Sequence, residues 1–338
     1  MLRKLFVYVC FAALVVLLSA GAQADTFWNV PGDFDTIQDA INAASPGDTI
    51  IVGAGLWDGA VINKESLAII GIGGAQIIGV DLLSNSTALV GFLLAFDEVE
   101  REGYANNTTI SNFSFEDMDY PVYSSYNNVI TVSHLKIKRC QVGISNVAGS
   151  NWTITHNEIE DLIYSNPDFG LPIGINLCGY ESIAASNNLV AFNDISSLDP
   201  TGCTGAFACI GIFLGAGVLP TLPPGPVMNN KIVHNNVQIN GGNYSAGLCF
   251  WGAITYINSN RVGFNDFRGT YVSTEPPMGF EMFLYQQGAS PEANDFSRNF
   301  GDLWMFVPSP AFENIDTGEN RAYDGFPADL FNPQPPEE

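Results

Sequence analysis

Positive charge is scarce in this sequence of 338 residues. It has 12 Lys and Arg against 35 Asp and Glu, which gives a formal net charge of −23. Binding to duplex nucleic acid or to an anionic membrane surface requires clustered Lys and Arg, so the charge balance excludes both as electrostatic partners. Apolar residues make up 46% of the chain. That content is typical of a globular protein with a substantial core, and it excludes a disordered acidic segment.

Metal-ligand patterns are also missing. The sequence contains three His, and its six Cys include no C-x-x-C pair, so the spacing typical of a structural zinc site is absent. A periplasmic metal-accessory protein is one hypothesis for this sequence. It is disfavoured because such a protein would need clusters of His, Met and Cys, which the sequence lacks. We expect no cofactor. The one ion left open is Ca²⁺, held by Asp and Asn oxygens.

Long apolar runs are absent except near the N-terminus. There, Arg3 and Lys4 precede the apolar run 5–18, which leads to Ala22-Gln23-Ala24. This order is the pattern of a secretory signal peptide, and the run is shorter than the roughly 18 residues that a membrane span needs. We predict cleavage after Ala24 and a secreted protein, extracellular or periplasmic, without a membrane span. Losing Arg3 and Lys4 would make the net charge two units more negative, −25.

Five cysteines remain after the predicted cleavage. Cys203 and Cys209 flank a short Thr-Gly-Ala-Phe-Ala loop, and an oxidising compartment permits disulfides. We predict that these two form a disulfide. Because five is an odd number, at least one thiol stays free or pairs between chains.

One phrase recurs along the chain: an apolar anchor, followed three residues later by a residue of fixed type. The anchors are Ile69, Leu89, Ile110, Val132, Ile154, Val190, Ile232, Val262 and Phe296. The later position is apolar in the first four repeats and Asn in the last five, at Asn157, Asn193, Asn235, Asn265 and Asn299. An inward Asn can hydrogen-bond with its copies in neighbouring coils, so we predict a structural asparagine ladder.

A second phrase places Gly between two apolar residues. It occurs at Val142-Gly143-Ile144, Ile173-Gly174-Ile175, Ile210-Gly211-Ile212, Ala246-Gly247-Leu248 and Met278-Gly279-Phe280. Both phrases alternate with period two and are rich in β-branched and aromatic residues, so they predict short strands. The Gly predicts a tight bend or a close approach of backbones. Repeats of this kind stack as the coils of a parallel β-helix.

His134, His156 and His234 lie one residue before the column that becomes Asn, and they take turns with Asn112, Phe192 and Phe264. Phe192 separates His156 from His234. We therefore predict solvated turn residues and no metal site.

The segment 35–44 predicts an amphipathic helix in which Asp35 and Gln38 form a capping box. Its apolar face consists of Ile37, Ala40, Ile41 and Ala44. A turn and a strand follow at 45–52, and then Gly55-Leu56-Trp57-Asp58-Gly59. This order resembles the opening of the right-handed parallel β-helix proteins of the pectin-lyase-like superfamily. The later Asn and Gly phrases resemble the repeats of its NosD-like and carbohydrate-active members.

The resemblance covers about residues 30 to 300. It implies an all-β chain, a single-stranded right-handed parallel β-helix with an N-terminal capping helix. It implies no particular activity, because the superfamily includes lyases, hydrolases, esterases and epimerases. We divide the chain into a signal peptide at 1–24, the β-helix at 25–311, and a C-terminal cap and irregular tail at 312–338.

Strand alternation predicts an outward aromatic stripe on adjacent coils, with one carboxylate beside it. Its members are Phe213, Trp251, Glu281, Phe283 and Tyr285. Aromatic faces with polar neighbours suit sugar rings, so the stripe is the candidate substrate-binding groove. The alternative is that the long insertions between the later strands fold over the stripe and bury it as a satellite core.

The catalytic motifs that the resemblance would carry are missing. Polyuronate lyases need a cation beside the uronate carboxylate, whereas Arg261, Arg268 and Arg298 are isolated. The motifs of polygalacturonases, pectin methylesterases and alginate epimerases do not occur. We predict a secreted protein that binds a polysaccharide, a cell-surface glycan or another extracellular surface. The alternative is a polysaccharide hydrolase or lyase that uses carboxylates from the loops. These loops carry Asp161, Asp168, Asp199 and Glu275, and the sequence does not select a pair among the acids.

Overall fold

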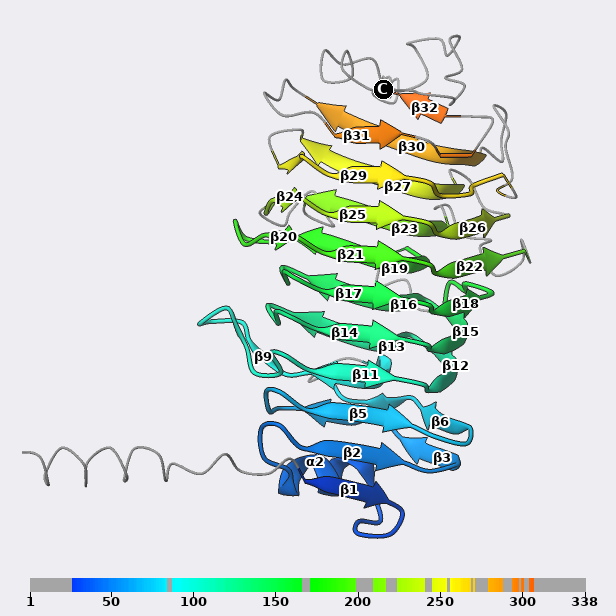
Figure 1. Ribbon diagram of the computed structural model, residues 1–338. Coiled ribbons are helices and arrows are strands. Elements are labelled where there is room, and N and C mark those ends of the chain that lie inside the picture. The colour runs from blue at the N-terminus through cyan, green and yellow to red at the C-terminus, as the bar shows by residue number, and fades with distance from the viewer. Residues whose placement is uncertain are drawn as a thin grey trace, which may run out of the picture.

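The chain coils into a rod, shown as a ribbon in Figure 1. The computed structural model describes residues 26–306, except 84–86, 166–170, 199–208, 217–223, 241–244, 254–255, 269, 271–278, 288–293, 298 and 301–303. The predicted signal peptide at 1–24 and the predicted tail at 312–338 lie outside the described residues, so this division of the chain stays a prediction.

Three sheets run along the rod, and each coil contributes one strand to most of them (Figure 1). Neighbouring strands within each sheet are parallel, apart from β7, which is antiparallel to β8. The sheet here named sheet A has ten strands in the described part of the chain: β1 (Phe27–Val30), β2 (Thr49–Val52), β5 (Ala68–Gly71), β11 (Thr109–Ser111), β14 (Thr131–Ser133), β17 (Thr153–Thr155), β21 (Leu189–Ala191), β25 (Lys231–Val233), β29 (Arg261–Gly263) and β31 (Asp295–Ser297). At about 4.8 Å per step, ten strands make a rod roughly 43 Å long.

Sheets B and C complete each coil. Sheet B contains β3 (Gly55–Asp58), β6 (Ala75–Ile78), β12 (Ser114–Met118), β15 (Lys136–Cys140), β18 (Glu158–Glu160), β22 (Asp194–Ser197) and β26 (Asn236–Ile239). Sheet C contains β4 (Ala60–Ile62), β7 (Val80–Asp81), β8 (Leu89–Leu94), β13 (Tyr120–Ser125), β16 (Val142–Val147), β19 (Ile173–Gly179), β23 (Ile210–Ala216), β27 (Ser245–Ala253), β30 (Gly279–Gln287) and β32 (Trp304–Phe306).

Two smaller sheets lie beside the coils. Strands β9 (Phe96–Asp97) and β10 (Glu102–Gly103) form an antiparallel hairpin, here named the β9–β10 hairpin. Strands β20 (Ala185–Ser186), β24 (Val227–Met228) and β28 (Ile257–Asn258) form a short parallel sheet. Both lie on the same side of the rod in Figure 1.

The core is a column of apolar residues that follows the axis. Ile110, Val132, Ile154 and Val190 occupy the same register position in successive sheet A strands, and all four are fully buried. The predicted anchors are therefore confirmed, with one exception. Leu89 begins β8 in sheet C, and β5 pairs directly with β11. The prediction for Leu89 was wrong because the coil between Ile69 and Ile110 is longer than its neighbours and contains apolar phrases of its own.

The predicted asparagine ladder is confirmed. The Asn157 Nδ2 donates to Asn193 Oδ1 at 2.9 Å, and the same bond joins each later pair as far as Asn299. Sequence reasoning missed a second ladder that starts two residues before the anchors. In it, Asn230 Nδ2 donates to Asn260 Oδ1, and Asn260 Nδ2 to Asn294 Oδ1, both at 2.9 Å. Both ladders satisfy amide groups that would otherwise be buried without partners.

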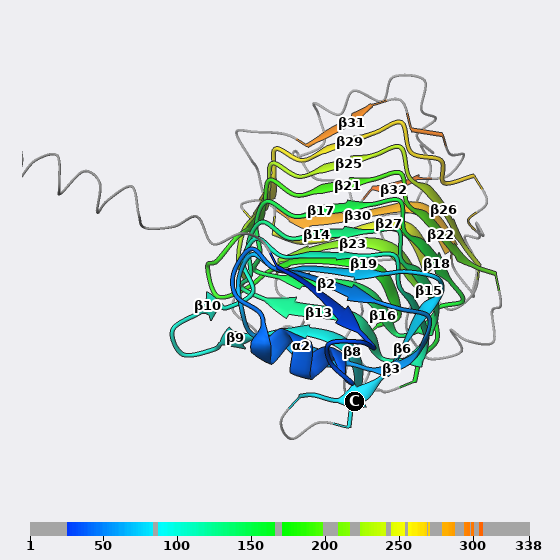
Figure 2. The same cartoon turned by 60° about the horizontal axis from the view of Figure 1, so that its bottom comes forward.

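The helix α2 (Ile37–Ala43) covers the first coil (Figure 2), as predicted. Ile37, Ala40 and Ile41 are buried in the core. The predicted capping box was wrong by one residue, because Thr36 is the N-cap and its Oγ1 accepts from Asp39 N at 3.0 Å. Gln38 Nε2 donates instead to the carbonyl oxygen of Val61, and Gln38 Oε1 accepts from the backbone N–H of Val61. These two bonds satisfy the edge of β4.

The Gly phrases at 142–144, 173–175 and 210–212 mark a close approach between coils, as predicted. A Cβ atom at Gly143 would lie 2.6 Å from the carbonyl oxygen of Gly174. A Cβ atom at Gly174 would lie equally close to the carbonyl oxygen of Gly211, and one at Gly211 equally close to that of Gly247. Three successive coils therefore leave no room for a side chain at this position.

Candidate functional site

The outer face of sheet C carries a second apolar cluster, separate from the core. Its buried members are Ala88, Val90, Leu93, Tyr120, Val142, Ile173, Ile210, Phe213, Ala246 and Cys249. Leu82, Leu83 and Leu171 pack against it from outside the strands of this sheet. Most of this face is therefore covered, which is the alternative that the sequence left open.

The predicted stripe is divided by this arrangement. Phe213 is 5% exposed, and its ring lies across Gly215, where a Cβ atom would come within 2.1 Å of Phe213 Cε1. Trp251 is 46% exposed on the same sheet. The structure thus buries one predicted aromatic residue and leaves the other accessible to a ligand.

The last repeat of the stripe was predicted in the wrong register. Ser245 pairs with Gly279, so Phe283 lies opposite Cys249 and Tyr285 lies opposite Trp251. Glu281 falls level with Gly247, two residues away from the row of Phe213. The Gly phrase at 278–280 does not continue the glycine column, because Gly279 is shifted by two residues. The side chains of Glu281, Phe283 and Tyr285 lie outside the described residues, so their role in binding stays a prediction.

A cleft opens on sheet C next to the covered region. It lies against strands β13, β16 and β19, and its volume is about 260 Å³. Its lining residues are Glu98, Tyr120, Tyr123, Ser125, Tyr126, Val142, Ser145, Val147, Leu171, Ile173, Asn176, Cys178 and Tyr180. Four tyrosines, two serines and an asparagine give it aromatic faces and uncharged polar groups together, and we name it the tyrosine cleft.

The tyrosines support one another through ring contacts. Tyr120 and Tyr123 meet edge to face with ring centroids 5.1 Å apart, and Tyr126 lies 6.5 Å from Tyr180. Phe96 of the β9–β10 hairpin contacts both Tyr123 and Tyr126. Such contacts restrict the rings to fixed orientations before any ligand arrives.

Sequence reasoning missed these residues, although a signal exists. The segment Tyr120-Pro121-Val122 occupies the same register as Val142-Gly143-Ile144, with Pro in the place of Gly. The predicted stripe was located by counting from the Gly of each phrase, so this coil, which has Pro at that position, was left out. Three tyrosines within seven residues, at 120, 123 and 126, are the remaining signal.

Asn127 anchors the β9–β10 hairpin beside the cleft. Its Oδ1 accepts from Ala105 N at 2.7 Å, and its Nδ2 donates to Leu94 O and Ala95 O, both at 3.2 Å. On the far side of the hairpin, Arg101 forms a 2.8 Å ion pair with Glu181. The hairpin is thus joined both to the next coil along the chain and to the loop that carries Tyr180.

Burial raises the pKa of all four cleft tyrosines, and it raises that of Tyr126 to about 12, with a further contribution from the carboxylate of Glu181. The phenols are therefore neutral hydrogen-bonding groups near neutral pH. Because the folded pKa lies above the unfolded value of about 10, stability from Tyr126 is complete below pH 10 and is lost as the pH rises towards 12.

We expect the wild type to lose stability relative to Tyr126→Phe between pH 10 and pH 12. The loss should be at most about 1.4 kcal/mol for each pH unit, the value for one titrating group. Urea unfolding of both proteins at pH 8, 10 and 11.5 measures it. A constant difference between the two proteins across this range would contradict the assignment.

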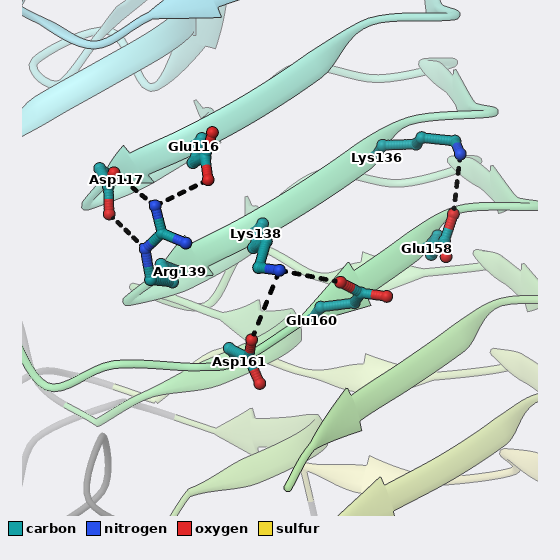
Figure 3. Close-up of polar contacts among 8 residues, drawn as sticks. All are labelled: Glu116, Asp117, Lys136, Lys138, Arg139, Glu158, Glu160 and Asp161. Atoms are coloured by element: carbon teal, nitrogen blue, oxygen red, sulfur yellow. Dashed lines mark hydrogen bonds and ion pairs between the residues drawn. The ribbon is translucent and has the colours of Figure 1, made fainter. Parts of the chain in front are cut away.

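Charged residues gather on the outer face of sheet B, where ion pairs join neighbouring strands (Figure 3). Arg139 bonds to Asp117 at 2.6 Å and to Glu116 at 2.7 Å, which holds the pKa of the Asp117 carboxyl below its usual range. Lys136 pairs with Glu158, and Lys138 with Glu160 in the next coil. These surface pairs contribute little individually, but they offset repulsion between the stacked acidic residues.

Every arginine in the described part of the chain is paired with a carboxylate. Besides Arg101 and Arg139, Arg261 pairs with Asp295 and Arg268 with Asp266. Arg298 lies outside the described residues, and the lack of a lyase-type cation stays a prediction.

The three histidines occupy the turn between sheets A and B, as predicted. Each adopts a left-handed backbone conformation, with φ between 56° and 58°. Because the turn repeats, the rings stack in the order His134, His156, Phe192, His234 and Phe264, with centroids 5.0–5.2 Å apart. Among the described residues, no group of three or more His, Cys, Asp or Glu is placed to hold a metal ion. A Ca²⁺ contact stays a prediction.

Cys140 and Cys249 are buried free thiols, and burial raises the pKa of both; Cys178 is buried as well. Cys203 lies outside the described residues, so its disulfide with the buried Cys209 stays a prediction. A helix with the length and continuous apolarity to cross a bilayer does not occur in the described part of the chain.

Comparison with known proteins places the fold. No protein-family model matches the chain, and no curated protein matches it. It does align with the catalytic domain of a GH87 alpha-1,3-glucanase in complex with tetrasaccharides, with a TM-score of 0.51 and 13% identity over 84% of this chain and 47% of that one. It aligns similarly with the tailspike protein of E. coli bacteriophage HK620 in complex with a pentasaccharide, with a TM-score of 0.50 and 12% identity over 82% of this chain and 54% of that one.

The chain thus spans about half the length of these structures. Identities of this size establish the fold and nothing more specific. The protein is a right-handed parallel β-helix, as the sequence predicted. The resemblance to NosD-like and carbohydrate-active repeats stays a prediction.

Proposed function

We propose that this protein binds carbohydrate in the tyrosine cleft and acts as an exported β-helix protein. The observation that carries the proposal is the lining of the cleft, where Tyr123, Tyr126 and Tyr180 surround Ser145 and Asn176. Sugar rings present an apolar face edged by hydroxyl groups, and tyrosine offers both an aromatic face and a hydroxyl. The two β-helix structures that the chain resembles were each solved with an oligosaccharide, which supports the same class of ligand.

The register of sheet C suggests the direction of a bound chain. Ser125, Val147 and Cys178 line the cleft in one row, which continues through Gly215 to the exposed Trp251. Cys178 and Trp251 are two coils apart, roughly 10 Å. An oligosaccharide lying along the rod axis would contact the tyrosines at one end and Trp251 at the other.

The ligand we propose is an uncharged glycan. Glu98 is the one charged residue among those that line the cleft, and nearby Arg101 is held by Glu181. A uronate or sulfate group would meet a carboxylate without a compensating cation. The strongly acidic sequence adds to this repulsion.

Binding without cleavage fits the described carboxylates better than hydrolysis. Glycoside hydrolysis uses two carboxyl groups flanking one bond, and the cleft lining contains one carboxylate, Glu98. Asp161, a loop acid considered for catalysis, lies 3.9 Å from Lys138 on sheet B (Figure 3). Asp199 lies outside the described residues.

A panel of neutral and acidic polysaccharides, scored for binding and for cleavage with and without Ca²⁺, tests the proposal. We expect binding of a neutral glycan, and we expect Tyr180→Ala to weaken it about tenfold through the loss of ring stacking. Trp251→Ala should weaken long oligosaccharides more than short ones. Release of new reducing ends by the wild type would instead support the hydrolase alternative.

The matched control is Phe192→Ala. Phe192 is also an exposed aromatic residue, 53% accessible, but it belongs to the ring stack between sheets A and B. Its removal should leave glycan affinity unchanged. Equal loss of affinity in Phe192→Ala and Tyr180→Ala, or no binding to any glycan, would overturn the proposed site.

A further inference from the structure

Asn176 is a buried amide that lacks a full set of partners. It is 6% exposed at the floor of the tyrosine cleft, and its Nδ2 donates to Ser145 Oγ at 3.2 Å. Its Oδ1 is buried and accepts no hydrogen bond. A buried amide needs partners for both its oxygen and its nitrogen.

In the described part of the chain, the buried asparagines of the ladder have partners for their side-chain oxygens. The Oδ1 of Asn193 accepts from both the backbone and the side-chain nitrogen of Asn157, and the Oδ1 of Asn235 accepts from Asn193 in the same way. An unpartnered buried amide oxygen destabilises the fold. Its presence at Asn176 therefore calls for a partner other than the protein.

The row that contains Asn176 does not require an amide. Its neighbours in the next two coils are Phe213 and Cys249, both buried in the apolar cluster. An apolar side chain at position 176 would fit the same face and would remove the unpartnered atom. If position 176 served packing alone, an apolar side chain would therefore stabilise the fold better than asparagine does.

We infer that Asn176 determines specificity in the cleft by accepting a hydrogen bond from an uncharged donor on the bound saccharide. This inference rests on the proposed function. Val142, Leu171 and Ile173 line the same cleft, and desolvating an ammonium group among apolar side chains costs more than desolvating a neutral one. The donor is therefore a sugar hydroxyl or the N–H of an acetamido group, two sources of the same chemistry.

The test uses Asn176→Leu in the full chain. We measure its thermal unfolding midpoint and its affinity for cellotetraose and chitotetraose, which differ by a hydroxyl or an acetamido group at C2. Monodeoxy derivatives of the tighter ligand follow. We expect the unfolding midpoint to stay equal or to rise, and the affinity to fall at least about tenfold, because a site built to bond a donor discriminates strongly.

The decisive comparison is between ligand and protein changes. Deleting the recognised donor should weaken binding to the wild type and leave binding to Asn176→Leu unaffected, as in a double-mutant cycle. If Asn176→Leu loses more affinity for chitotetraose than for cellotetraose, the donor is the acetamido N–H. If removal of one hydroxyl from the sugar lowers the affinity of the wild type, the donor is that hydroxyl. Ser145→Ala, which leaves the Asn176 acceptor in place, should retain the preference between these ligands.

Two outcomes would overturn the inference. One is a lower unfolding midpoint in Asn176→Leu, which would show a structural role for the amide. The other is equal loss on donor deletion in both proteins. In both cases wild-type binding and the Tyr180→Ala effect would persist, whereas failure of the proposed function would abolish all glycan binding.

Discussion

Asn235→Ala is expected to lower the free energy of unfolding by about 4 kcal/mol. The Asn235 Nδ2 donates to Asn265 Oδ1 and Val190 O, each at 2.9 Å, and its Oδ1 accepts from the backbone and side chain of Asn193. Removing the amide leaves buried groups on two neighbouring coils without partners. The loss therefore exceeds that of one ordinary hydrogen bond, and chemical denaturation measures it.

Asn236→Ala is the matched control. Asn236 is the next residue, half-buried, and its Nδ2 makes an exposed 3.1 Å bond to Asp194. Its removal should change the free energy of unfolding by less than about 0.5 kcal/mol. Similar effects of the two substitutions would show that the ladder does not stabilise the coils.

Gly211→Ala is expected to destabilise the fold by about 3 kcal/mol or more. The added Cβ would lie 2.3 Å from Val237 Cγ1 and 2.6 Å from the carbonyl oxygen of Gly247. The carbonyl belongs to the adjacent coil and cannot move without disturbing the hydrogen bonds between β23 and β27. The thermal unfolding midpoint and the soluble yield report the effect.

Gly74→Ala separates this overpacking from ordinary effects of replacing glycine. No atom lies within 4 Å of a Cβ at Gly74, although its φ of +94° disfavours alanine. Backbone strain alone should cost about 1 kcal/mol there. Tolerance of alanine at Gly211 equal to that at Gly74 would disprove the close approach between coils.

Periodic features of this protein were predictable from the sequence because each coil repeats the same physical requirement. The apolar anchor recurs along sheet A, and the buried Asn recurs in the last five repeats, so several copies together identify each column. Leu89 shows the limit of this reasoning. Its coil carries apolar phrases from two different sheets, and no single-residue pattern tells one sheet from another.

The candidate site was only partly predictable. Trp251 was placed correctly on the outer face of sheet C. Phe213 is buried instead, because its ring lies over Gly215 and packs in the apolar cluster. The tyrosine cleft combines β13, β16 and β19 with Glu98 of the β9–β10 hairpin and Tyr180 of a loop. These contributions are separated by up to 82 residues, from Glu98 to Tyr180, and no repeat relates them.

The sequence by itself determined the parallel β-helix, its helical cap, the inward Asn and Gly columns and the scarcity of cationic groups. These features depend on alternation along a strand and on identical neighbours one coil away, which are local rules. Only the tertiary structure decided which outward residues are covered and where a cleft remains open. That outcome depends on how non-repeating loops pack against sheet C, and packing between unlike segments leaves no period in the sequence.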